Sequence, residues 1–165
     1  MDHYKSWSGL NKWLIESLCE ELQGRVTYFL TRYHKAHDVY GRAAMLMDGQ
    51  EWVCFSWIEQ CRQEQQVSTK YLEDRNWESI VKALKPHWDA ACTYCEWDFL
   101  KAVLEFRNLS IRDALRSENY IIKTLAILDR RVGKRTLQKI QDAREYDQYP
   151  VWVRQFFELR FSVTF

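Results

Sequence analysis

The sequence has little glycine and carries none of the short motifs by which many enzymes are identified. Only five of its 165 residues are glycine, and it contains no Gly-rich phosphate loop, G-x-S-x-G elbow, H-E-x-x-H motif or zinc-finger spacing. The chain therefore has few glycines from which to build a loop that cradles a nucleotide. These absences favour a protein without catalytic activity over an enzyme, and we assign no catalytic residue and expect no cofactor.

The chain also has almost no net charge and no long apolar run. Its 24 basic and 23 acidic residues leave a formal charge of +1, which gives no global field to steer polyanions or acidic membranes. It lacks an 18-residue apolar run and an apolar leader flanked by Arg or Lys, so we expect no membrane partner. With five cysteines, this pattern predicts a cytoplasmic protein.

Aromatic residues, in contrast, are abundant. The chain has eight Trp, nine Tyr and eight Phe, and 47% of its residues are hydrophobic. Each buried ring removes a large area from water, so we expect one core built largely on aromatics. The length suits a single domain over residues 1–165, with a helix and sheet in 1–59 and a helical layer in 60–165.

The first 58 residues predict one helix and three strands. Leu10, Leu14, Leu18 and Leu22 recur at helical spacing between a Ser8 cap and Gly24. Alternating patterns then predict strands over 25–31, 40–47 and 51–58, with a tight hairpin at Asp48-Gly49. The expected fold class is therefore α+β, an N-terminal helix plus a three-stranded antiparallel meander packed against a C-terminal helical layer.

The remainder of the chain has helical patterns. We expect helices over 76–85, 96–107, 110–115, 119–132, 134–141 and 150–161. Pro86 is expected to end the first of these, and Gly133 to close the helix over 119–132 as its C′ residue. In the second, the expected apolar stripe consists of Trp97, Leu100, Val103 and Leu104, and Glu96 is expected on the charged outer side.

The most concentrated polar run joins the first and second strands. It contains seven candidate binding residues: Arg32, Tyr33, His34, Lys35, His37, Asp38 and Arg42. An oriented His37 base beside basic residues that hold a phosphate would suit phosphodiester chemistry or anion capture. A solvated hairpin turn is the simpler explanation, because adjacent strand residues such as His37 and Asp38 point to opposite faces.

A second candidate is the only cluster of positive charge. Arg130, Arg131, Lys134 and Arg135, with Lys139 about a turn later, offer cations for phosphates or for an acidic protein surface. The structural explanation is that Arg130 and Arg131 occupy the last turn of a helix, where cations complement the helix dipole.

Four residues are of the types that bind zinc in other proteins. Cys92 and Cys95 form a C-x2-C pair, and His87 and Cys61 precede them. A second tight pair is absent, and the first lies in an aromatic, helical stretch. We therefore expect structural thiols and no metal.

These motifs, taken in order, resemble a family of small bacterial proteins. The resemblance rests on Trp7-Ser8 with Leu10, Gly24-Arg25-Val26, Thr31-Arg32-Tyr33 with Lys35, His37-Asp38, Gly41-Arg42, Asp48-Gly49, Trp97-Asp98-Phe99, Leu109-Ser110-Ile111 and Leu128 to Arg135. It covers nearly the whole chain. The family has no assigned activity, so the resemblance implies a single-domain bacterial protein and no mechanism.

Two functions follow as expectations. The first is a protein-interaction module, such as an immunity protein or antitoxin in bacterial competition or phage defence, which acts by steric occlusion of another protein. This expectation rests on the composition, because the chain is near-neutral and rich in Trp, Tyr and Arg, residue types that anchor interfaces. The second is a nucleic-acid-binding or nuclease-like protein that uses the basic, His-containing hairpin as a local basic patch.

Overall fold

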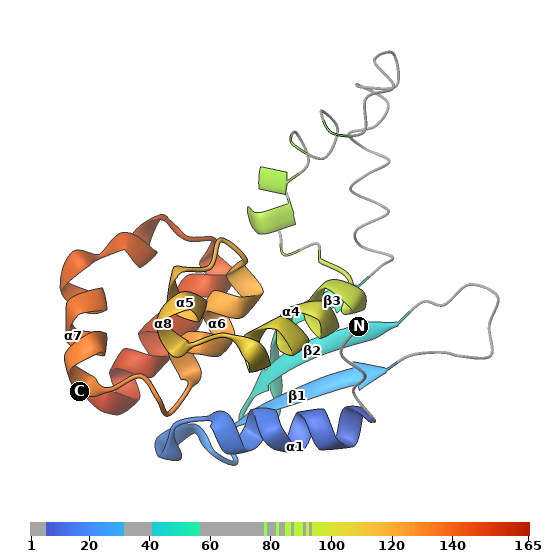
Figure 1. The fold of residues 1–165 in the computed structure, drawn as a ribbon, viewed down its shortest axis with the longest axis horizontal. Coiled ribbons are helices and arrows are strands. Elements are labelled where there is room, and N and C mark those ends of the chain that lie inside the picture. The colour runs from blue at the N-terminus through green and yellow to red at the C-terminus, as the bar shows by residue number, and fades with distance from the viewer. Residues whose placement is uncertain are drawn as a thin grey trace.

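The computed structural model describes residues 6–31, 41–56, 78, 82, 85–86, 88–90, 92 and 94–165. The elements in chain order are α1 (Trp7–Ser17), the 3-10 helix η1 (Glu20–Leu22), β1 (Val26–Thr31), β2 (Arg42–Met47), β3 (Gln50–Ser56), α4 (Glu96–Asn108), α5 (Ile111–Arg116), α6 (Tyr120–Leu128), α7 (Lys134–Ala143), η2 (Glu145–Gln148) and α8 (Val151–Thr164). This order confirms the predicted α+β class (Figure 1). Among the described residues, every helix is too short or too polar to cross a bilayer.

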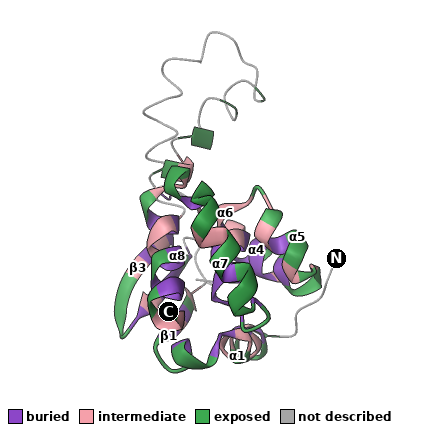
Figure 2. Cartoon of the chain, turned by 90° about the vertical axis from the view of Figure 1, so that its left-hand side faces the viewer, coloured by how far each residue is buried: buried purple, intermediate pink, exposed green. Residues whose placement is uncertain are grey.

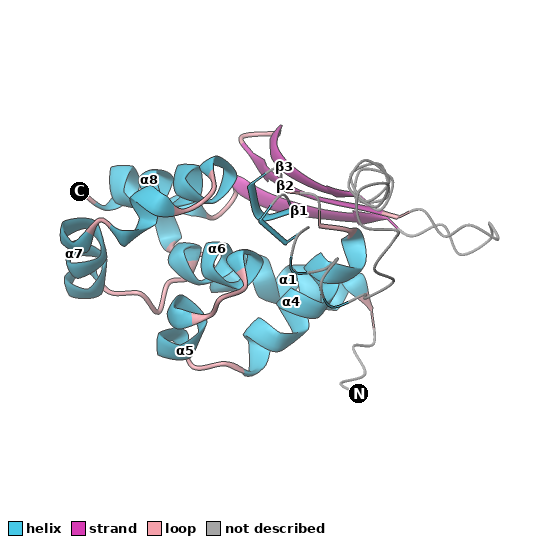
Figure 3. Ribbon diagram, turned by 90° about the horizontal axis from the view of Figure 1, so that it is seen from above, coloured by secondary structure: helices cyan, strands magenta, loops and turns pink. Residues whose placement is uncertain are grey.

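The sheet is an antiparallel meander with its strands in sequence order, β1-β2-β3. Asp48 (φ 50°) and Gly49 (φ 78°) both adopt the left-handed conformation of the predicted hairpin. Val26 and Tyr28 share one face with Met45 and Phe55, all of them buried. Helices α1 and α4 lie against this face, on the same side of the sheet (Figure 3).

Phe99 of α4 is the centre of the packing between sheet and helices. Its ring centroid lies 5.0 Å from that of Phe55, 6.4 Å from Tyr28 and 6.0 Å from Trp7. Strands β1 and β3 and helices α1 and α4 therefore meet at one fully buried ring. Such aromatic pairs contribute more to stability than the burial of their apolar area alone provides.

Helices α5 to α8 gather beside the sheet, and their buried positions face inward (Figure 2). Trp152 of α8 reaches the sheet, with its ring 6.1 Å from Phe55, and Gln155 donates to the Trp52 carbonyl at 3.2 Å. A second aromatic group joins η2 to α8, because Tyr146 stacks on Phe157 at 5.8 Å. The buried side chains from α1 to α8 form one hydrophobic cluster.

Several predicted helix ends are wrong by a few residues. Ser6, and not Ser8, caps α1 by accepting a hydrogen bond from the Gly9 N–H at 3.2 Å. The helix then ends at Ser17, and the chain continues through η1 before Gly24. Pro86 itself is helical, as are residues 88–90, so this proline does not end helical structure as predicted.

The largest error concerns the end of α6. The helix stops at Leu128, four residues before the predicted end, and Gly133 is the N-cap of α7 with φ −76°. Arg130 and Arg131 therefore lie in the turn that follows α6, and not in the last turn of a helix. The competing interaction is local, because Asp129 accepts hydrogen bonds from the turn that follows it.

The predicted faces of α4 are right at Leu100 and Val103, which are buried, but wrong at Trp97 and Glu96. Trp97 is 43% exposed, whereas Glu96 is completely buried, and Phe99 and Phe106 take the places in the core. Glu96 Oε1 accepts the N–H of Gly41 at 3.2 Å, and Oε2 has no hydrogen-bond partner. The carboxylate of α4 thereby fixes the backbone where β2 begins.

Position 41 has no room for a side chain, since a Cβ there would lie 2.6 Å from Cγ of Glu96. We predict that Gly41→Ala lowers the free energy of unfolding by about 1–3 kcal/mol, the usual cost of overpacking. Gly9→Ala is the control, because its Cβ would meet no atom closer than 3.6 Å and alanine favours a helix. Urea unfolding measures both; equal stability of Gly41→Ala and wild type would contradict the prediction.

Candidate functional site

Most of the predicted hairpin site lies outside the described residues. The residues outside the described part are Arg32, Tyr33, His34, Lys35, His37 and Asp38. Their role in a binding site stays a prediction. Arg42 is described, at the start of β2, where it forms an ion pair with Glu51. Its guanidinium carbon also lies 6.0 Å from the centre of the Phe29 ring. The hydrogen bond to Glu51 raises the pKa of Arg42, so this charge already has a partner.

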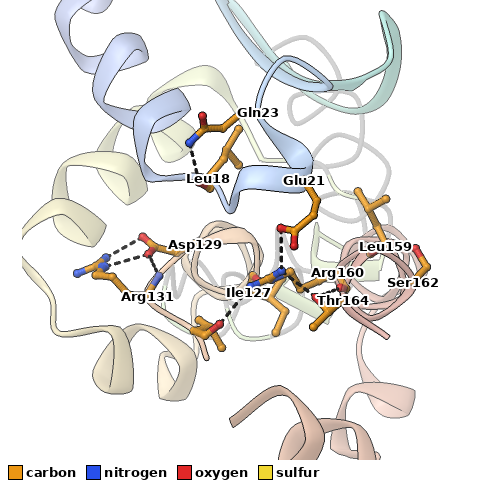
Figure 4. Close-up of polar contacts among 11 residues, drawn as sticks. Leu18, Glu21, Gln23, Ile127, Asp129, Arg131, Leu159, Arg160, Ser162 and Thr164 are labelled. Carbon is orange, nitrogen blue, oxygen red and sulfur yellow. Dashed lines mark hydrogen bonds and ion pairs between the residues drawn. The ribbon is translucent and has the colours of Figure 1, made fainter. Parts of the chain in front are cut away.

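The basic turn between α6 and α7 is built around a buried carboxylate. Asp129 is 2% exposed and accepts the backbone N–H of Arg131 at 2.7 Å. Its two oxygens also accept from Nε and Nη2 of Arg131, at 3.0 and 2.9 Å (Figure 4). The Arg131 guanidinium carbon lies 5.6 Å from the centre of the Phe106 ring. The Arg131 guanidinium therefore pairs with the Asp129 carboxylate and also lies near the Phe106 ring.

A second arginine, Arg160 of α8, holds the same turn from inside. Arg160 is 5% exposed, and its Nε donates to the Ile127 carbonyl at 3.2 Å and its Nη2 to the Val132 carbonyl at 3.1 Å (Figure 4). Its Nη1 donates to Thr164 at 2.8 Å and lies 4.0 Å from a carboxylate oxygen of Glu21. This one side chain joins η1, the end of α6, the turn and α8.

The turn is also joined to the end of α1. Leu18 and Asp129 form an isolated antiparallel bridge. The Cys19 N–H donates to the Leu128 carbonyl at 3.0 Å, and the Arg130 N–H to the Ser17 carbonyl at 2.8 Å. The segment from Leu128 to Val132 therefore has a structural role. All four predicted binding residues here, Arg130, Arg131, Lys134 and Arg135, are exposed, and Arg131 among them is paired with Asp129.

Two of the four predicted zinc ligands, Cys61 and His87, lie outside the described residues. Cys92 and Cys95 are buried free thiols, and Cys92 Sγ lies 3.8 Å from the Cys54 carbonyl oxygen. Burial raises the pKa of Cys95 to about 12 and raises that of Cys92 as well. In the described part of the chain, no three His, Cys, Asp or Glu residues are grouped to hold a metal. Both thiols are therefore poor thiolate donors in this arrangement.

A groove of about 480 Å³ lies between α5 and α7. Its floor is apolar and aromatic, and is formed by Ile111, Leu115, Val132, Ile140, Tyr146 and Phe157. Four cations line it, namely Arg112 and Arg116 of α5, Arg131 of the turn and Lys139 of α7, together with the carboxylate of Glu145. Its volume falls in the range of ligand-binding pockets. Charge and apolar surface coincide in this groove.

A model of the SF0329 protein family matches residues 6–161. The chain belongs to the SF0329 protein family. No curated protein and no solved structure matches it. The match to the SF0329 family spans α1 to α8 as far as Phe161, so the turn, Arg160 and the groove all lie within the matched region.

The sequence interpretation did not predict the groove, although it noted two of the four cations that line it. It singled out Arg131 and Lys139, but it missed Arg112, Arg116 and the aromatic floor. A local signal for the two arginines exists, since they stand one helical turn apart on α5 beside Ile111 and Leu115. The position of α7 opposite them depends on contacts far apart in the sequence, which no local pattern shows.

Arg160 provides a test of the structural role of the turn. We predict that Arg160→Met costs about 1–3 kcal/mol for each of the two carbonyls, of Ile127 and Val132, that it leaves unpaired. Arg135→Met, on the exposed surface of α7, is the matched control and should change stability by less than about 0.5 kcal/mol. Tryptophan fluorescence in urea gives both values, and coincident unfolding curves for the two variants would refute the structural role.

The thiols provide a second test. At about pH 8, near the ordinary pKa of a cysteine, we predict that Cys92 and Cys95 of the native protein react slowly with iodoacetamide, because burial keeps them protonated. In denaturant both should react at the rate of a model thiol. Peptide mass spectrometry after a short pulse measures the difference. Fast labelling of either thiol in the native protein would contradict the described burial.

Proposed function

We propose that this member of the SF0329 family is a protein-binding module without catalytic activity, and that it acts by covering a surface of its partner. The groove between α5 and α7 carries the proposal, since it combines an aromatic floor with cations at its edges. Tyr, Trp and Arg supply much of the binding energy at protein interfaces, where a desolvated apolar centre is surrounded by polar contacts. The groove has this composition.

The charges at the groove favour a protein partner over nucleic acid. Arg131 of the groove already pairs with Asp129, and Arg42, which lies on β2 outside the groove, pairs with Glu51, so fewer cations remain for phosphates. Arg112, Arg116 and Lys139 have no ion-pair partner within the described residues, and they surround an apolar floor and not a flat basic stripe. A phosphate backbone is bound mainly by charge and gains little from such a floor.

An immunity protein or antitoxin of a bacterial cytoplasm is the role that we propose. Proteins of this kind neutralise a toxic partner by occupying its surface, and they need affinity and shape but no reaction. The near-neutral charge of the chain suits selective pairing through local charges, which set specificity and association rate. The same mode of action suits defence against phage.

Capture from native lysate tests this function. Tagged wild-type protein is compared with the double variant Arg112→Glu/Arg116→Glu, after nuclease treatment of the lysate. We expect the wild type to retain a defined protein partner, and the groove variant to retain at least about tenfold less, because close interfacial charge pairs contribute ~1.5 kcal/mol or more each.

The matched control is Lys12→Glu/Lys101→Glu, which makes the same change of charge at exposed positions on α1 and α4. It should retain the partner as well as the wild type does. Equal capture by the groove variant, or recovery of no protein partner, would count against the proposed function.

A further inference from the structure

The two walls of the groove carry cations that the fold itself does not use. Arg131 is already held by two hydrogen bonds from its guanidinium to Asp129. Arg112, Arg116 and Lys139, in contrast, have exposed side chains and no ion-pair partner among the residues that the structure describes. Only one carboxylate, Glu145, is among the residues that line the groove. The groove is thus far more cationic than the chain as a whole, which has a formal charge of +1.

The floor is apolar and held in place before any ligand arrives. The Phe157 ring lies 5.8 Å from Tyr146 and 5.4 Å from Tyr149, and Tyr146 lies 5.2 Å from Phe161. Side chains packed in this way have already lost their rotamer freedom in folding, so binding to them costs little further entropy. The floor therefore suits large apolar side chains of a partner.

The spacing of the cations favours one secondary structure in that partner. Arg112 and Arg116 are four residues apart on α5, a spacing that matches carboxylates one turn apart on a second helix. Lys139 stands on the opposite wall, in α7. A helix presents an apolar stripe flanked by polar residues on both sides, whereas a strand sends alternate residues to opposite faces. The walls and floor together fit the helix.

We propose that the groove binds an acidic amphipathic helix of a partner protein. Its apolar stripe lies on the aromatic floor, and its flanking carboxylates pair with Arg112, Arg116 and Lys139. This is the helix-in-groove mode of recognition, with charges on both walls that fix the register. The inference rests on the proposed function and specifies the partner's chemistry.

Fluorescence anisotropy with synthetic peptides tests the inference on the full-length protein. The first probe is a labelled helix of about four turns, with leucines on one stripe and glutamates on both sides of it. The second replaces every glutamate by glutamine, and the third has two prolines that break the helix. We expect the acidic helix to bind at least about tenfold more tightly than either of the other two, which corresponds to 1.4 kcal/mol.

The protein variants localise the binding. Arg112→Gln/Arg116→Gln should weaken binding of the acidic helix by about tenfold or more, and added salt should weaken binding to the wild type, because salt screens exposed charges. Lys12→Gln/Lys101→Gln is the control and should bind as the wild type does. A thermal unfolding curve for each variant shows that it is folded.

Three results would overturn the inference: equal binding of the acidic and glutamine peptides, equal binding of the proline peptide, or an unchanged affinity in the arginine variant. Tighter binding of a single-stranded oligonucleotide than of any peptide would also overturn it. These failures are distinguishable from failure of the proposed function. If the groove variant still loses its partner in lysate, the partner is a protein with a different binding element.

Discussion

The architecture of the C-terminal half depends on one buried cation. Arg160 donates to the carbonyls at the end of α6 and in the following turn, and it lies near Glu21 of η1. A buried guanidinium needs a full set of acceptors, so its position fixes those of the segments that supply them. The turn between α6 and α7 sets where α7 begins, and α7 is one wall of the groove. The proposed binding site therefore depends on an arginine that does not line it.

The aromatic residues divide into two groups with different tasks. Phe99 and its neighbours hold the sheet to α1 and α4, and none of them lines the groove. Tyr146 and Phe157 hold η2 against α8, and the same side chains form part of the groove floor. In the second group, packing and recognition use the same atoms, so a change that weakens binding there also weakens the fold.

Sequence patterns predicted the features of the fold that depend on neighbouring residues, such as helix caps and tight turns. Ser110 caps α5 through the Asp113 N–H, and Asp48-Gly49 forms the hairpin, as their sequence signals indicate. Glu96 and Gly133 were misassigned because distant or competing partners decide them: the Gly41 backbone binds Glu96, and Asp129 ends α6 before Gly133 is reached. The groove escaped prediction for the same reason. Its two walls come from helices separated by α6 in the sequence, and only tertiary packing places them opposite each other.

The bond between Glu96 and Gly41 has a consequence for the order of events during synthesis. Its partners are 55 positions apart, and the contact of Trp152 with Phe55 spans a still longer stretch of chain. Helix α1 leaves the ribosome before the strands, but α4 and α8 leave after them, and contacts between distant segments form late because long loops must close first. Part of the apolar face of the nascent sheet therefore stays uncovered until α4 and then Trp152 have been translated, and a chaperone has its clearest opportunity to bind in that interval.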